Sequence, residues 1–400
     1  MPTKPKAKHP TKPTATARPR TARRQTAVPP LAMVLEPRLQ AHTPRSTRRG
    51  STPYWWWLGA LGGGSILVLV VSTVVVVMNA STSSNGSETK PVGTTLRVET
   101  IAAPLTGLPL PPEVAARRPW AVVVSNLPAS RPQTGLSQAD VVLEAPAEAG
   151  ITRYLGVFQS QLPERVGPVR SARPYFNDWA SSFNALYSHS GGSSEALEQL
   201  KAGYGNLQDV NEFWNGAAYQ RDPSKKAPHN LFTGLERFWN YTTTHNWLGF
   251  KGFVPFVFGT VLTPGVATTN FTIPYQPNEY QVRYDWDAAN QSWRRSVGGK
   301  VQTDTANNAT ITTKNVVVMV TDIVPMPNDP LLKVTITTLG SGRAILLRDG
   351  YRYEGRWAKP TLDSALTFTD VSGNPLPLAV GNTWISVIDK SLVNAVQAQP

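Results

Sequence analysis

Hydrophobic positions alternate between strand-like and helix-like spacing in residues 104–250. Residues 120–124 form a short uncharged run, which is typical of a buried strand. Residues 140–145 and 154–158 predict two further strands. Residues 174–183 place apolar side chains at i, i+3, i+4 and i+7, so they predict a helix with one buried face. Alternating elements of this kind predict an α/β domain.

The pattern changes after residue 250, where helical spacing fades and β-branched, alternating segments take over. Val316 to Val320 predict a buried strand, and Trp384 to Ile388 predict the last strand of the series. Asp349-Gly350 separates two alternating segments, which is a strong signal for a two-residue hairpin. Residues 251–395 therefore predict a mainly antiparallel β domain.

A single uncharged apolar run occupies residues 55–78. An α-helix rises about 1.5 Å per residue, so roughly 20 apolar residues cross a bilayer core of about 30 Å. The run is too long for the apolar part of a cleaved signal peptide, which is about 7–15 residues. We therefore predict an uncleaved signal anchor, that is, one transmembrane helix. The Ser-, Thr- and Gly-rich segment 79–103 predicts a flexible stalk.

The charge is unevenly distributed along the chain. Residues 1–54 contain 12 Lys or Arg and one acid, and so carry +11 of the chain's net charge of +13. Basic residues beside a span stay in the cytoplasm, which predicts a cytoplasmic N-terminus and extracytoplasmic C-terminal domains in the cell membrane. The tail is too polar to fold and is expected to be disordered. It acts as a solvated leader or attracts anionic lipid or nucleic acid; we expect no nucleic acid bound by the folded domains.

The chain contains no cysteine. This excludes disulfides, thiolate metal sites, a cysteine nucleophile and lipid attachment through an N-terminal cysteine. No H-E-x-x-H, G-x-S-x-G or nucleotide-binding loop is present, so the sequence predicts neither a metal nor a cofactor. Whether the protein is an enzyme is left open.

Two arginines precede the predicted helix at residues 174–183. Arg170, Ser171 and Arg173 lie directly before it. Guanidinium groups bind carboxylate or phosphate in bidentate fashion, and a helix N-terminus favours an anion. The segment is therefore a candidate anion-binding site. Alternatively, the arginines are surface residues that pair with local acids such as Asp178.

Two histidine-containing turns are further candidates. His189 precedes Gly191 and Gly192, and such a turn either cradles an anion or is a plain strand-to-helix connection that needs glycine geometry. His229 precedes Asn230. A histidine can act as acid, base or ligand near neutral pH, but beside proline it is equally a structural hydrogen-bonding residue.

Glu144 and Glu148 are four residues apart at the end of a predicted strand. A pair of carboxylates can perform acid–base chemistry on a sugar bond, although this spacing is not specific. The pair is therefore weighed only as an alternative to a binding site.

Several strings of residues resemble a known family. The most specific are Gly167-Pro168-Val169-Arg170-Ser171-Ala172-Arg173-Pro174 and Ala227-Pro228-His229-Asn230. Weaker strings include Arg131-Pro132-Gln133-Thr134-Gly135 and Gly150-Ile151-Thr152-Arg153-Tyr154. Over residues 104–390 the chain resembles the YerB-like family of bacterial surface proteins, a two-domain family of unknown function.

The resemblance implies an extracytoplasmic bacterial protein held at the membrane. Many members of the family look like lipoproteins, whereas this chain has no cysteine and has an apolar anchor in its place. It also has Ser125 where an acid is expected before Asn126, which puts a metal or acid role at that position in doubt. The family brings no established activity.

The sequence favours a membrane-anchored protein that binds an anionic or sugar-bearing envelope component. Two alternatives stay open: a hydrolase of envelope polymers that uses Glu144 or Glu148 with His189 or His229, and a scaffold whose β domain docks another envelope protein. The candidate ligand-binding residues are Arg131, Glu144, Glu148, Arg153, Arg170, Ser171, Arg173, Asp178, His189, Gly191, Gly192, His229 and Asn230.

Overall fold

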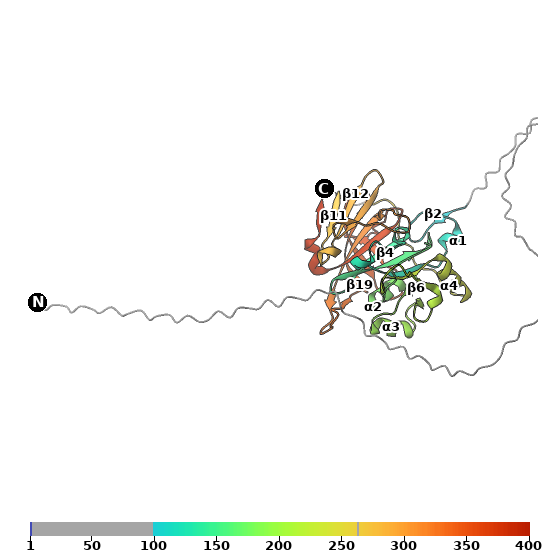
Figure 1. Ribbon diagram of the computed structural model, residues 1–400. Helices are drawn as coiled ribbons and strands as arrows, with labels where there is room; N and C mark the ends of the chain where they lie inside the picture. The colour runs from blue at the N-terminus through green and yellow to red at the C-terminus, as the bar shows by residue number, and fades with distance from the viewer. Residues whose placement is uncertain (2–98, 262–263) are drawn as a thin grey trace, which may run out of the picture. The chain divides into compact units, whose positions relative to one another are not determined.

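The computed structural model describes residue 1 and residues 99–261 and 264–400 (Figure 1). The predicted transmembrane helix, the rest of the basic tail and most of the predicted stalk lie outside these residues. Among the residues that are described, no helix is long and apolar enough to cross a membrane.

A central sheet of eleven strands organises the described chain. Ten strands follow one another in space, and the eleventh, β21 (Thr367–Asp370), pairs with β20. In spatial order the ten are β10 (Val266–Ala267), β20 (Tyr351–Lys359), β19 (Gly340–Arg348), β16 (Asn315–Thr321), β22 (Thr383–Asp389), β4 (Val141–Glu148), β5 (Ile151–Phe158), β3 (Trp120–Ser125), β6 (Leu186–His189) and β7 (Gln208–Asn211).

Strands from both predicted halves of the chain share this sheet. The connection is the parallel pair β22–β4, in which Thr383 lies opposite Val141 and Ser386 opposite Glu144. β3, β6 and β7 are also parallel, whereas β5 runs antiparallel to both β3 and β4. The change in sequence pattern predicts a domain boundary near residue 250. The central sheet is continuous across that boundary, because it contains strands from both sides of it.

A second sheet of six strands is antiparallel throughout. It consists of β14 (Lys300–Val301), β13 (Ser292–Val297), β12 (Val282–Asp287), β11 (Asn270–Ile273) and β23 (Gln397–Gln399), with β15 (Thr312–Thr313) paired to β13. Three two-stranded ladders complete the β structure. They are β1 (Ile101–Ala102) with β2 (Pro109–Leu110), β8 (Tyr219–Arg221) with β9 (Leu231–Thr233), and β17 (Ile323–Pro325) with β18 (Val334–Ile336).

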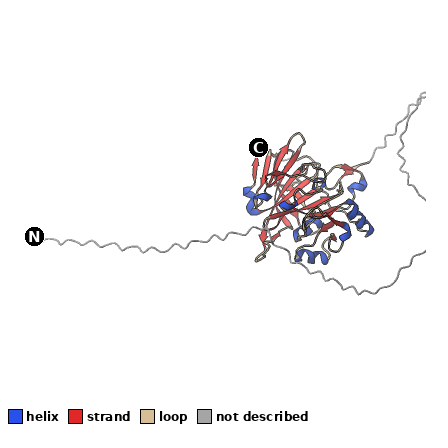
Figure 2. Cartoon of the chain, in the orientation of Figure 1, coloured by secondary structure: helices blue, strands red, loops and turns tan. Residues whose placement is uncertain are grey.

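Helices are few and short (Figure 2). The α-helices of the described residues are α1 (Pro112–Ala115), α2 (Pro174–Ser181), α3 (Ser194–Lys201) and α4 (Asn240–Thr244). The predicted helix at residues 174–183 is confirmed as α2, which buries Phe176, Trp179 and Ala180. The fold is thus richer in strands, and poorer in helices, than the predicted α/β pattern of residues 104–250 implied.

One hydrophobic cluster lies on each face of the central sheet. Because side chains alternate along a strand, β3 sends Val122 and Val124 to one face and Ala121 and Val123 to the other. The first face packs against the second sheet, and the other face packs against α2 and α3. In Figure 1 the second sheet, labelled at β11 and β12, lies on one side of the central sheet, and the two helices lie on the other side. This layered arrangement decides which polar residues at the strand ends can meet.

Candidate anion-binding site

The parallel strands β3, β6 and β7 end at the same edge of the central sheet, because the carboxyl ends of parallel strands share an edge. Open α/β sheets bind ligands at this edge. Here an extended segment that contains Arg170 lies between β3 and β6. The Arg170 backbone N–H donates to the Val123 carbonyl (2.9 Å), and the Ser190 N–H donates to the Arg170 carbonyl (3.0 Å).

A β-bulge in β4 places Glu148 on the same face as Arg153. Up to Pro146 the register is regular, with Glu144 opposite Tyr154 and Ala145 opposite Arg153. The register then shifts between Pro146 and Glu148, because one extra residue is accommodated there. Without the shift, Glu148 would share the face of Glu144.

Glu148 forms ion pairs with two arginines. Its Oε2 lies 2.8 Å from Nη2 of Arg173, and its Oε1 pairs with Nη2 of Arg153. Nη1 of Arg153 also donates to the Ser171 carbonyl (2.9 Å), and Nη1 of Arg173 donates to the Ala172 carbonyl (2.8 Å). We call Glu148, Arg153, Arg170, Ser171 and Arg173 the guanidinium cluster.

Positive charge exceeds negative charge in the guanidinium cluster. Burial and the neighbouring Arg173 and Arg170 lower the pKa of Arg153, Glu148 raises it in part, and the net pKa is about 10. Burial would raise the pKa of Glu148, but Arg153, Arg173 and Arg170 together hold that pKa below its ordinary value. Three guanidinium groups thus share the field of one carboxylate, which is the electrostatic requirement for binding a further anion.

A cavity of about 230 Å³ lies beside Arg173, between α2 and the β17–β18 ladder. Asp178 lines this cavity as well, but it is not the partner of an arginine. Its carboxylate accepts hydrogen bonds from the hydroxyl groups of Tyr204 (2.6 Å) and Thr338. The acid that pairs with the arginines is therefore Glu148, and Asp178 ties the middle of α2 to Tyr204 and Thr338.

The His189 turn supports the arginine segment through its backbone. His189 is fully buried; its Nε2 lies 2.8 Å from Asp209 Oδ1, and its Nδ1 lies 2.7 Å from the Gly191 carbonyl. The Gly191 N–H donates to Asn211 Oδ1 (3.0 Å), and Gly192 forms a parallel bridge with Ala172. These groups satisfy one another, so the turn acts as a scaffold for the guanidinium cluster.

His229 lies beside the guanidinium cluster, whereas Asn230 points to another partner. Burial, together with the charge of Arg170, lowers the pKa of His229 below its ordinary value. The Oδ1 of Asn230 instead accepts a hydrogen bond from Nη1 of Arg221 (3.1 Å). His229 and Asn230 therefore do not face the same part of the candidate site.

Arg131 bridges the two sheets. Its Nε donates to Asn126 Oδ1 (2.9 Å), and its Nη1 donates to the Glu279 carbonyl (2.7 Å). Its guanidinium carbon lies 5.0 Å from the centre of the Tyr280 ring. The contacts of Arg131 hold the segment after β3 against the second sheet, and no described contact joins it to the guanidinium cluster.

Glu144 is buried on the opposite face of the sheet. Its carboxylate pairs with Arg295 of β13 and accepts hydrogen bonds from Thr152 Oγ1 (2.8 Å) and Trp384 Nε1 (3.3 Å). Both members of the ion pair are 0 % exposed. Arg295, which the sequence reasoning missed, therefore fastens the second sheet to the central one, and Glu144 is separated from Glu148 by the sheet itself.

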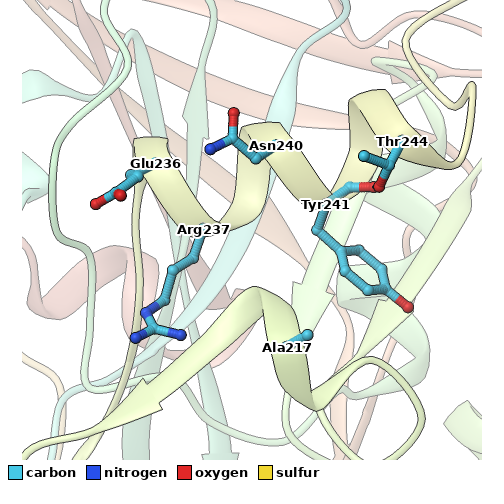
Figure 3. Close-up of a pocket in the computed structure, with 6 residues that line it drawn as sticks. All are labelled: Ala217, Glu236, Arg237, Asn240, Tyr241 and Thr244. Atoms are coloured by element: carbon cyan, nitrogen blue, oxygen red, sulfur yellow. The ribbon is translucent and has the colours of Figure 1, made fainter. Parts of the chain in front are cut away.

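Other concave surfaces carry none of the predicted site residues. A shallow cavity of about 400 Å³ lies on α4 and is shown in Figure 3. It is lined by Ala217, Glu236, Arg237, Asn240, Tyr241 and Thr244. Within residues 99–261 and 264–400, no group of three or more His, Asp or Glu side chains could hold a metal ion.

Comparisons with known proteins match most of the described chain. The models of the N-terminal and C-terminal domains of a protein family of unknown function (DUF3048) match residues 105–248 and 271–385. The chain is 33% identical over 291 residues to "Putative lipoprotein YerB" of Bacillus subtilis (strain 168), which covers 72% of this chain and 86% of that protein. A crystal structure of YerB from Bacillus subtilis has a TM-score of 0.67 and 31% identity, and covers 75% of this chain and 100% of that one.

Proposed function

We infer that this chain, which belongs to the YerB-like family of two-domain proteins of unknown function, is a membrane-associated extracytoplasmic protein that binds an anionic component of the cell envelope. Its similarity to the putative lipoprotein YerB supports a location outside the cytoplasm, at the membrane. The finer topology is also part of the proposal: residues 55–78 anchor the chain, and the +11 charge of residues 1–54 keeps its N-terminus in the cytoplasm.

The single observation that carries the binding proposal is the imbalance of charge in the guanidinium cluster. Arg153 and Arg173 are already oriented by Glu148 and by backbone carbonyls. An incoming phosphate or carboxylate would therefore meet preorganised donors and would not have to order two long side chains. Arg170 is half-buried, and its guanidinium group adds a third positive charge to the field at Glu148.

Arg170→Gln is expected to weaken binding of a poly(glycerol phosphate) test polymer by about 10- to 150-fold, because one charge-assisted contact contributes about 1.5–3 kcal/mol. Binding is measured by isothermal titration calorimetry on the purified chain, at low and at high salt. The matched control is Arg343→Gln, since Arg343 is an exposed arginine paired with Glu354 far along the sheet on β19. Equal losses in the two variants, or no binding by the wild-type chain, would reject the proposal.

The hydrolase alternative is less favoured by the geometry. A general acid for glycoside cleavage needs a raised pKa, whereas the arginines hold the pKa of Glu148 below its ordinary value. Glu144 lies on the other face of the sheet, inside the ion pair with Arg295. His189 uses both ring nitrogens on Asp209 and Gly191, so it contributes no available base.

A further inference from the structure

A cleft of about 760 Å³ opens where the segment after β3 meets the loop between β14 and β15. Its volume lies within the roughly 300–1,000 Å³ of small-molecule sites. The polar residues that line it come from both halves of the chain: Thr134, Gln138, Glu164, Arg165, Lys225, Thr305 and Asn307. None of them belongs to the guanidinium cluster, so the cleft is a separate site.

One buried carboxylate fixes both walls of this cleft. Asp304 is 1% exposed, and its Oδ1 accepts hydrogen bonds from the backbone N–H groups of Gly135 and Ala306, each at 2.8 Å. Its Oδ2 accepts a third, from the Ser137 N–H (2.7 Å). Because the same side chain holds the segment from one half and the loop from the other, the cleft is preorganised.

Four of the residues that line the cleft carry uncharged hydrogen-bonding side chains: Thr134, Gln138, Thr305 and Asn307. The hydroxyl groups of Thr134 and Thr305 lie 2.6 Å apart, and the amide of Asn307 donates to Ser137 Oγ (3.2 Å). Gln138 adds a second side-chain amide. Hydroxyl and amide groups both donate and accept, so they suit a ligand that offers hydroxyl groups and amides of its own.

The charges around the cleft balance. Arg165 pairs with Asp222 at 2.5 Å and lies over the ring of Phe232. Lys225 and Glu164 also line the cleft and carry opposite charges. The site therefore has no net charge to attract an anion, which separates its chemistry from that of the guanidinium cluster.

We propose that this cleft binds an uncharged oligosaccharide whose sugars carry N-acetyl groups. The sugar hydroxyls would exchange hydrogen bonds with Thr134 and Thr305, and the acetamido groups with Gln138 and Asn307. Leu162 and Leu235, which also line the cleft, offer apolar surface to the C–H faces of the sugar rings. The proposal does not rest on the guanidinium cluster.

The test is calorimetric titration of the purified full chain with a trimer of N-acetylglucosamine and, separately, with cellotriose, which lacks the amides. The trimer is expected to bind, and the double variant Gln138→Ala, Asn307→Ala is expected to weaken it by about tenfold, because two polar contacts are lost. Ala306→Trp, at an exposed position on the rim, is expected to abolish binding by filling the cleft.

Two controls separate this site from its surroundings. Gln161→Ala removes the same chemical group from a side chain that contacts Gln138 but does not line the cleft, and it should change binding by less than about twofold. Arg170→Gln should leave trimer binding unchanged, which distinguishes failure here from failure of the anion site. Absence of trimer binding, equal binding of cellotriose, or full binding by Ala306→Trp would overturn the proposal.

Discussion

Arg295→Leu is expected to lower the free energy of unfolding by about 3–5 kcal/mol, the usual loss when one member of a buried ion pair is removed. The loss arises because Glu144, which is 0 % exposed, would keep a buried carboxylate without its counter-charge. Burial alone would lower the pKa of Arg295, but Glu144, together with Tyr154 and Tyr284, outweighs burial and raises the pKa of Arg295 above its ordinary value. Urea denaturation followed by tryptophan fluorescence measures the change.

The double variant Glu144→Leu, Arg295→Leu separates the ion pair from simple packing. Removing both members leaves no buried uncompensated charge, so the double variant should be more stable than Arg295→Leu alone. The matched surface control is Arg343→Leu, whose pair with Glu354 is roughly half exposed on both sides and should contribute less than about 1 kcal/mol. If Arg295→Leu lost no more than Arg343→Leu, the buried ion pair would contribute no more to stability than a surface pair, and the proposed role of Arg295 would be wrong.

This ion pair also shows which features of the fold a local sequence pattern can predict and which it cannot. The strands at residues 120–124 and 316–320 could be predicted because each is an uncharged run, and both are confirmed within β3 and β16. The Asp349-Gly350 hairpin is confirmed too, with Arg348 opposite Tyr351. These features depend on neighbouring residues, which is why periodicity and turn chemistry suffice.

Pairing between distant segments could not be predicted in the same way. β22 lies beside β4 although about 240 residues separate Thr383 from Val141, and no local pattern encodes that parallel register. Arg294 and Arg295 are neighbours of the same type, yet the side chain of Arg294 is 51% exposed and that of Arg295 is 0 % exposed. Strand alternation places the two side chains on opposite faces of β13, but which of them is buried, and that its partner is Glu144, depends on how the two sheets pack.

The arginines and Glu148 were all candidate residues from the sequence, but the pairing of Glu148 with the arginines was not predicted. Arg170 and Arg173 precede α2 as expected. The expected acid, Asp178, is engaged by Tyr204 and Thr338, and Glu148 takes its place only because the β4 bulge turns it to the other face. A bulge depends on how two strands pair, so the sequence of one strand does not reveal it.

Glu148→Gln is expected to destabilise the fold and to strengthen anion binding at the same time. The substitution leaves the largely buried Arg153 and Arg173 without a counter-charge, which should lower the free energy of unfolding by about 2–4 kcal/mol. It also removes the carboxylate that competes with a ligand for the same guanidinium groups. Glu354→Gln, in the exposed pair with Arg343, is the control and should change neither property.

The pH dependence supplies a second readout. Because the pKa of Glu148 is lower in the folded state than its unfolded value, the stability that it contributes is present above the unfolded pKa of about 4.3. That stability is lost as the pH falls through the folded pKa. Unfolding free energies measured from pH 7 to pH 3 should therefore fall more steeply for the wild-type chain than for Glu148→Gln.

Added phosphate distinguishes a binding site from a purely structural ion cluster. A ligand that binds only the folded state at one hundred times its dissociation constant adds about 2.7 kcal/mol of stability. Phosphate should thus restore most of the stability that Glu148→Gln loses, and should raise the stability of the wild-type chain less, because Glu148 already pairs with Arg153 and Arg173 there. If phosphate stabilised both chains equally, the three guanidinium groups would serve only to neutralise Glu148 and to hold the edge of the sheet together.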